Sequence, residues 1–273
     1  MIQRCKTGAL TATSATKLLG TSFAAGARRS VHTLRDRILR VKKIAHRAQQ
    51  LTRLGLSAVE YVRGAAIPAM LYGSEIMGMS DSMTHDACVV AAAALAPPTA
   101  GKDPTLVVHA AAVHSIDTNP VVMANVAPIK TWACAWWDSW EEPDALVDAF
   151  KKGNTKVSNA WPLPWNAVNG PAAALAATCR RLRWRTDDGK LFRDDVGDLL
   201  DASRDSPKAF ANAARRSAVR LQTDAMLKSI PAAAPKGCDI SFHSTFAASN
   251  EREGGRKYVL VDLVPFLRPL YRG

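Results

Sequence analysis

The sequence lacks several features that would place it in a common class of protein. No apolar run approaches the roughly 18 charge-free residues that a membrane span needs, and Pro97 and Pro98 end the alanine-rich stretch. The five cysteines are far apart and include no Cys-x-x-Cys pair, which argues against a zinc site and a disulfide framework. There is no GxxxxGK[ST] phosphate loop and no dinucleotide fingerprint. We therefore expect reduced thiols, no cofactor, no small-molecule substrate and no membrane span.

Acidic residues are missing from residues 1–35, which hold six Lys or Arg and are rich in Ser, Thr and Ala. This composition is typical of a mitochondrial transit peptide. A chain cut from a longer basic protein explains the same composition, and we favour that interpretation. The expected location is therefore nuclear or cytoplasmic, with mitochondrial import as the alternative.

Positive charge is in excess and is unevenly distributed. The chain has 36 Lys and Arg against 24 Asp and Glu, a formal net charge of +12, which favours polyanionic partners through phosphate contacts and counterion release. Residues 1–63 carry thirteen basic and two acidic residues, residues 64–150 carry two and ten, and residues 151–273 carry twenty-one and twelve. A basic head and tail therefore flank an acidic middle.

Helix signals dominate the sequence. Between Val31 and Ala48 the apolar residues recur at steps of three and four, as one face of a helix requires. Ser57 with Glu60 forms a capping box for a second helix, which Pro68 bends or ends. Further helices are expected from Asp81 or Ser82 to Pro97, from Asp103-Pro104, from Asn119-Pro120, from Pro171 to about residue 183, and from Ser206-Pro207 to about residue 230.

These signals predict a mainly α fold, in which a helical array is followed by a smaller helical part with a short β-hairpin. The hairpin is expected to pair residues 182–186 with residues 190–193 through a turn at Asp188-Gly189. The predicted organisation is a basic N-terminal segment (1–30), a helical domain (31–152), a Gly- and Pro-rich linker (153–171), a small helix-hairpin-helix part (172–230) and a C-terminal tail (231–273).

The first helix carries a candidate binding surface. Arg40, Lys43 and Arg47 fall opposite its apolar stripe at about 100° per residue. Such a row can follow a phosphate backbone. The alternative is an ordinary solvated face, but seven Lys or Arg between Arg35 and Arg53, opposed only by Asp36, exceed what solubility needs. We predict that RNA or DNA contacts a set of cations on and just before this helix: Arg28, Arg29, Arg35, Arg40, Lys43 and Arg47.

Catalytic and metal-binding patterns are weaker. Residues 192–195, Phe-Arg-Asp-Asp, match the aromatic-x-Asp-Asp turn in which nucleotide polymerases hold two metal ions. That chemistry needs a third aspartate on an upstream strand, which this sequence does not offer. We interpret Asp194 and Asp195 as part of a solvated acidic hairpin. His109 and His114 are five residues apart, so they splay on a helix. We therefore expect no metal and no catalytic residue, and a metal-dependent enzyme is the least favoured alternative.

Four tryptophans lie close together in the predicted helix that begins at Pro120. Trp132, Trp136 and Trp140 are spaced by four residues and therefore share one face, whereas Trp137 does not. Exposed tryptophans can stack on bases, but a stripe with this spacing is more typical of a core or a domain interface. We predict a core stripe.

Several short segments together match one family. KLLG at residues 17–20 precedes the Arg-rich helix, and IPAMLYGSE at residues 67–75 has the form Pro-x-x-Leu-Tyr-Gly-x-Glu. WNAVNGP at residues 165–171 and LRW at residues 182–184, where Arg183 replaces a glycine, follow farther on. These segments resemble the region that follows the catalytic palm in reverse transcriptases of LINE-type, non-LTR retrotransposons.

The resemblance implies a helical thumb and connection region that grips a template–primer duplex through its backbone. It does not imply polymerase activity, because the family's fingers, palm and aspartate box would precede Met1, and residues 192–195 follow residues 17–20. We expect a non-catalytic remnant of such an enzyme. The alternative from another class is an imported mitochondrial protein with a structural or protein-interaction role.

Overall fold

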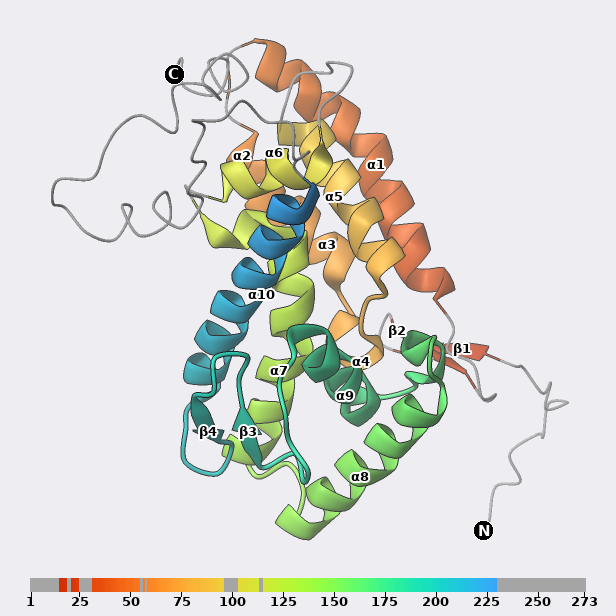
Figure 1. Ribbon diagram of the computed structural model, residues 1–273. Coiled ribbons are helices and arrows are strands. Elements are labelled where there is room, and N and C mark those ends of the chain that lie inside the picture. The colour runs from red at the N-terminus through yellow and green to blue at the C-terminus, as the bar shows by residue number, and fades with distance from the viewer. Residues whose placement is uncertain are drawn as a thin grey trace, which may run out of the picture.

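The computed structural model describes residues 15–18, 21–24, 31–54, 56, 58–95, 103–112 and 115–229. Helices make up most of these residues, and the strands form two short antiparallel pairs. The first pair joins β1 (Ala15–Leu18) and β2 (Thr21–Ala24). The predicted mainly α fold with a small β-hairpin is therefore confirmed (Figure 1).

The first buried cluster forms where α1 (His32–Arg53) packs on α5 (Asp81–Leu95). The predicted apolar stripe of α1 faces this contact, since Leu34, Ile38, Val41, Ala45 and Ala48 are all buried. The cluster is completed by residues of η1 (Val62–Ala66), α3 (Ile67–Leu71), α4 (Ser74–Met77) and α6 (Pro104–Ala111).

Pro68 changes the winding of the second predicted helix rather than ending it. The chain runs helically from α2 (Val59–Tyr61) through η1, a π-helical segment, into α3. A proline has no N–H for the carbonyl four residues earlier, and its ring crowds that carbonyl, so a wider turn is favoured just before it. The predicted cap, Ser57, lies outside the described residues.

The Tyr-Gly-x-Glu segment forms the tight turn between α3 and α4. Gly73 has φ of 87°, a left-handed conformation that favours glycine, and its N–H donates to Glu75 Oε2 at 3.0 Å. Tyr72 extends toward α1, where the Arg37 guanidinium carbon lies 4.7 Å from its ring centroid. This turn therefore ties the α3–α4 corner to α1.

The second buried cluster surrounds α7 (Pro120–Trp137), which packs against both α10 (Pro207–Ser229) and α9 (Pro171–Leu182). Figure 1 shows α7 in the middle of the molecule, with α10 alongside it and α8 (Pro143–Asn159) below. Ala124 of α7 belongs to the first cluster and its neighbour Val126 to the second. Both clusters therefore share this helix.

Two of the predicted helix starts are capped as expected. Asp103 accepts hydrogen bonds from the N–H groups of Thr105 and Leu106 at 2.7 and 3.2 Å, and α6 begins at the next residue, Pro104. Asn119 accepts hydrogen bonds at 3.0 and 3.4 Å from the N–H groups of the second and third residues of α7. Each cap satisfies backbone donors that the helix itself leaves free.

Residues 153–171, expected to be a linker, are packed into the second cluster. They include the last turns of α8 and the short 3-10 segment η3 (Pro164–Ala167), and both Val157 and Val168 are fully buried. At Gly153 a Cβ would lie 2.8 Å from the Ala173 nitrogen, so α8 and α9 approach closely there. In the described part of the chain, the change from one buried cluster to the other occurs instead around the start of α7.

The second hairpin differs from the predicted one. β3 (Leu191–Arg193) pairs with β4 (Leu199–Asp201), not with residues 182–186, of which Arg185 alone bridges to Arg193. The predicted first strand cannot form because Leu182 still belongs to α9, which ends as Arg183 takes a left-handed φ of 61°. Asp194 and Asp195 therefore lie in the turn between β3 and β4.

Candidate nucleic-acid interface

The described members of the predicted cationic set lie on the outer side of α1. Arg35, Arg40, Lys43 and Arg47 are exposed, and within the described residues none of the four has an ion pair. Arg28 and Arg29 lie outside the described residues. We call the four described side chains the basic row. At about 1.5 Å per residue it extends about 18 Å, or roughly five base-pair steps of a duplex.

The two other charged residues near the start of α1 have partners. Asp36, its sole carboxylate, lies 3.0 Å from His32 Nδ1. Arg37 donates to the Tyr72 carbonyl oxygen and stacks over the ring of the same residue. Asp36 is therefore the one carboxylate on the described part of α1, and it lies against His32 rather than against a member of the basic row.

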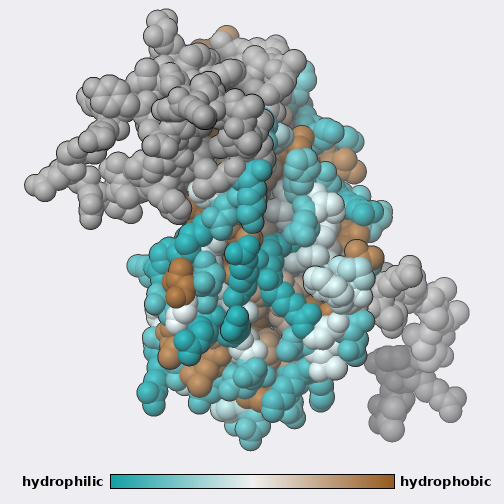
Figure 2. Space-filling model, viewed as in Figure 1, coloured by the Kyte–Doolittle hydropathy of each residue, from teal (hydrophilic) through white to brown (hydrophobic). Residues whose placement is uncertain are grey.

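Apolar side chains interrupt the basic row. Leu39 is 54% exposed and Ile44 is 46% exposed. Figure 2 shows hydrophilic and hydrophobic residues side by side along the edge of the molecule where α1 runs. The surface that α1 offers to a partner therefore combines charge with exposed apolar area.

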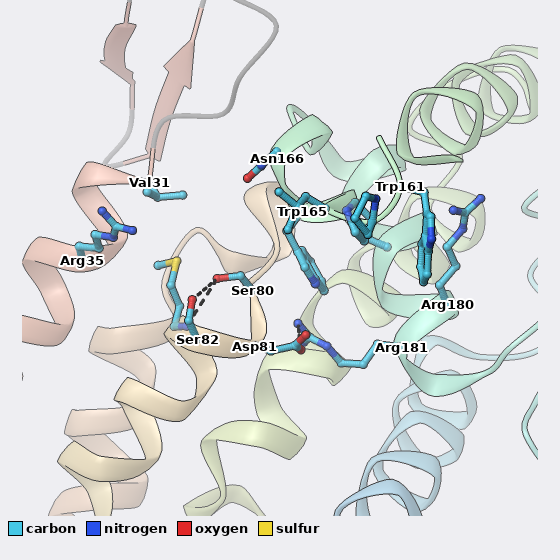
Figure 3. A pocket seen from close by; sticks show the side chains of 15 residues that line it. Val31, Arg35, Ser80, Asp81, Ser82, Trp161, Trp165, Asn166, Arg180 and Arg181 are labelled. Atoms are coloured by element: carbon cyan, nitrogen blue, oxygen red, sulfur yellow. Dashed lines mark hydrogen bonds and ion pairs between the residues drawn. The ribbon is translucent and has the colours of Figure 1, made fainter. Parts of the chain in front are cut away.

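A groove opens beside the N-terminal end of α1. It has a volume of about 760 Å³ and lies between Arg35, the start of α5, the end of α9 and the segment 161–166 that precedes and enters η3. In Figure 3 Val31 and Arg35 lie on one side, Trp161, Trp165 and Arg180 on the other, and Ser80 and Ser82 between them. Arg35 therefore belongs both to the basic row and to this groove.

The floor of the groove is fixed by Arg181. Its guanidinium pairs with Asp81 at 2.9 Å, donates to the Met79 carbonyl oxygen, and lies 4.1 Å from the ring centroid of Trp165. Burial lowers the pKa of Arg181 to about 10, against the opposing effect of Asp81, so the side chain stays charged at neutral pH. Arg181 thus joins α9 to the start of α5 and holds Trp165 in place.

The open side of the groove carries a positive charge that no described carboxylate pairs with, and exposed aromatic surface. Arg180 donates to Ser158 Oγ and, at 3.2 Å, to Asn154 Oδ1, both of which are uncharged groups. Trp161 is 74% exposed and Leu163 is 62% exposed. The groove therefore presents a guanidinium on each side and a free indole face.

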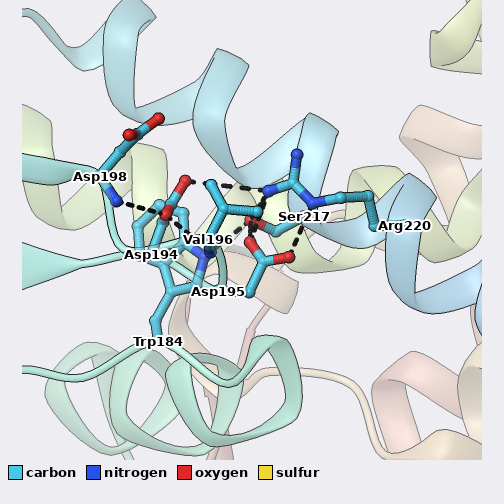
Figure 4. Close-up of polar contacts among 7 residues, drawn as sticks. All are labelled: Trp184, Asp194, Asp195, Val196, Asp198, Ser217 and Arg220. Carbon is cyan, nitrogen blue, oxygen red and sulfur yellow. Dashed lines mark hydrogen bonds and ion pairs between the residues drawn. The ribbon is translucent and has the colours of Figure 1, made fainter.

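The aspartate pair at residues 194–195 is occupied by protein groups (Figure 4). Asp194 is buried, and its Oδ1 accepts the N–H groups of Val196 and Asp198 at 3.0 and 2.9 Å. Asp195 accepts two hydrogen bonds from Arg220 at 2.7 and 2.6 Å. Burial by itself raises the pKa of Asp195, but the hydrogen bonds from Arg220 and Ser217 outweigh it, and the pKa lies below its ordinary value.

The prediction of a solvated acidic hairpin is thus wrong for both residues. Asp194 accepts hydrogen bonds from the backbone of the turn, and Asp195 accepts them from Arg220 of α10. The part of the chain that the structure describes holds no group of three or more His, Cys, Asp or Glu arranged to bind a metal ion. His109 is buried, and burial lowers its pKa. His114 lies outside the described residues.

The predicted tryptophan stripe is confirmed at two of its three positions. Trp132 and Trp136 are buried in the second cluster, and Trp132 Nε1 donates to the Gly189 carbonyl oxygen at 2.7 Å. Trp140 is 57% exposed because α7 ends at Trp137, so the helical spacing no longer applies. Trp137 is exposed, as expected for a residue off the stripe.

The sequence analysis did not predict the groove. Trp161 and Arg180 come from segments that were interpreted as a linker and as a plain helix, and Arg35 is more than a hundred residues from either. The run Trp-Pro-Leu-Pro-Trp at residues 161–165, in which each tryptophan adjoins a proline, was the one local signal of an exposed aromatic.

Among the described residues, no helix is both long and apolar enough to cross a membrane. Comparisons with protein-family models, with curated proteins and with solved structures gave no match to this chain.

Proposed function

We propose that this chain binds RNA or DNA without sequence preference, through contacts between the basic row of α1 and the phosphate backbone. The observation that carries the proposal is that Arg35, Arg40, Lys43 and Arg47 are exposed and lack ion pairs within the described residues. When such side chains neutralise phosphates, the cations condensed on the nucleic acid are released. This release supplies most of the free energy of non-specific binding.

We propose further that the chain is not an enzyme and derives from a LINE-type reverse transcriptase, as the thumb-like resemblance suggests. The occupied carboxylates of Asp194 and Asp195 support the first part, because both already accept hydrogen bonds from the protein. A non-specific grip on the backbone agrees with the role that the resemblance implies for this region. A nuclear or cytoplasmic location is proposed with this function.

The experiment is a salt titration of binding to a fluorescently labelled duplex of mixed sequence. The logarithm of the association constant should fall linearly with the logarithm of the salt concentration, with a slope of about −3 to −4 if the four side chains each contact one phosphate. A second duplex of unrelated sequence should give the same affinity. The proposal fails if no duplex binds at low salt, or if the affinity does not respond to salt.

A further inference from the structure

We propose that the groove beside α1 holds an unpaired nucleotide of a single-stranded extension, with its base stacked on Trp161 and its phosphates attracted by the guanidinium groups of Arg35 and Arg180, which line the groove from opposite sides. This inference rests on the proposed function, since the duplex on the basic row would deliver the extension. The basic row of α1 predicts binding to any duplex, whereas the groove predicts a preference for nucleic acid that has unpaired bases.

The charge of the groove favours a phosphate. Three guanidinium groups line it, from Arg35, Arg180 and Arg181, against the single carboxylate of Asp81, which Arg181 already pairs at 2.9 Å. Arg180 is held by the uncharged groups of Asn154 and Ser158, so its own charge is not cancelled. Two uncompensated positive charges therefore remain in a groove lined partly by apolar side chains, where ionic attraction is less screened than on an open surface.

The aromatic wall favours a base. Trp161 is 74% exposed, a large apolar area that the described part of the chain leaves uncovered. An indole face stacks on any base, and the strength of stacking depends little on sequence. A groove volume of about 760 Å³ exceeds what one nucleotide needs and lies within the range of ordinary ligand pockets.

The aromatic side of the groove, formed by Trp161 and Trp165, is already ordered before a base stacks on it. Trp165 is clamped on Arg181, and Gly78 lies so close beneath it that a Cβ there would be 2.5 Å from the Trp165 ring. Hydrogen bonds from the N–H of Leu163 to the Ala160 carbonyl, at 2.8 Å, and from the N–H of Asn166 to the Leu163 carbonyl, at 3.0 Å, fix the turn that presents Trp161. Less conformational entropy is lost when a fixed wall binds.

Arg35 connects the two surfaces. It is a member of the basic row, and it also lines the groove on the side opposite Trp161 (Figure 3). A duplex that follows α1 toward its N-terminal end therefore arrives at the groove. A strand that continues past the end of the duplex would enter between Arg35 and Trp161.

The test compares two labelled duplexes of about 20 base pairs that differ only in their extension: about five thymidines in one, and the same number of abasic sugar-phosphates in the other. Both carry the same phosphates, so the ratio of their dissociation constants isolates the contribution of the bases. We expect the thymidine extension to bind about tenfold more tightly to the parent protein. Trp161→Ala should bring this ratio close to one, whereas Trp161→Phe should retain most of it.

Trp137→Ala is the matched control, because Trp137 is also more than half exposed but does not line the groove. It should leave the ratio unchanged. A ratio near one for the parent, or a tenfold ratio that survives Trp161→Ala, would overturn the inference while leaving duplex binding intact. Absence of binding to both duplexes would instead refute the proposed function.

Discussion

Arg220 Nε and Nη2 donate to the two carboxylate oxygens of Asp195 at 2.7 and 2.6 Å, and this pair joins the turn of the β3–β4 hairpin to α10. Ser217 adds a hydrogen bond to the same carboxylate and accepts one from Trp184 Nε1 at 2.8 Å. A bidentate, charge-assisted pair of this kind fixes the orientation of both side chains. The hairpin is therefore anchored through Asp195 rather than open to solvent.

Arg220→Gln should lower the free energy of unfolding by about 1 to 3 kcal/mol, because it leaves the partly buried carboxylate of Asp195 without its charged partner. Urea denaturation followed by circular dichroism measures the change. Arg204→Gln is the control: Arg204 is 85% exposed and lies 3.8 Å from Asp201, so its loss should cost less than about 0.5 kcal/mol. Equal losses in the two variants would show that the Asp195–Arg220 pair has no special role.

Acid should weaken the same pair. The pKa of Asp195 is lower in the folded protein than in the unfolded chain, so the carboxylate stabilises the fold above its ordinary pKa of about 3.9 and loses this effect as pH falls through the folded value. The difference in stability between the parent and Asp195→Asn should therefore be constant near neutrality and shrink below about pH 4. Urea midpoints measured from neutral to acidic pH test this, and a difference that grows in acid would contradict it.

Gly78→Ala should destabilise the protein. Gly78 combines φ of 59° with ψ of 173°, a region that costs other residues about 1 to 3 kcal/mol, and its Cβ would meet the Trp165 ring. Gly64→Ala is the matched change: nothing lies within 4 Å of its Cβ and Gly64 sits in a helical segment, so the variant should gain about 0.5 to 1 kcal/mol. Thermal unfolding of both variants gives the comparison, and a Gly78→Ala protein as stable as the parent would disprove the close packing.

Local signals were enough to predict most of the helices. The apolar stripe of α1 and the caps at Asp103 and Asn119 depend on residues within a few positions of one another, and the structure places them as expected. Pro68 was predicted to bend or end its helix, but the helix continues to Leu71 after a π-helical segment, a change of winding that the sequence did not indicate.

Contacts between residues far apart in the chain could not be predicted from the sequence. β4 has three residues and no alternating pattern, so nothing in its sequence marked Leu199–Asp201 as the partner of β3. Asp195 and Arg220 are 25 positions apart, and the groove collects residues from four separate segments. Only packing brings such groups together, which is why the aspartates looked solvated and the groove was not anticipated.

Divalent metal ions should not stabilise the protein. Oδ1 of Asp194 already accepts two backbone N–H groups, and its Oδ2 is buried 3.8 Å from the Arg220 guanidinium, so a magnesium or manganese ion at the hairpin would face a fixed positive charge. We therefore expect the same Tm with and without added Mg²⁺ or Mn²⁺, measured by differential scanning fluorimetry. A Tm that rises to saturation with metal, and no longer does so in Asp195→Asn, would indicate a metal centre after all.

In the proposed function, phosphates contact the outer side of α1. One triple variant removes three charges opposite the buried stripe of α1: Arg40→Gln, Lys43→Gln and Arg47→Gln. A second triple variant removes three exposed charges from α8: Lys151→Gln, Lys152→Gln and Lys156→Gln. The slope of log association constant against log salt should become shallower by about 2 to 3 in the α1 variant and stay near the parent value in the α8 variant. Equal slopes for the two variants would contradict the assignment of the interface to α1.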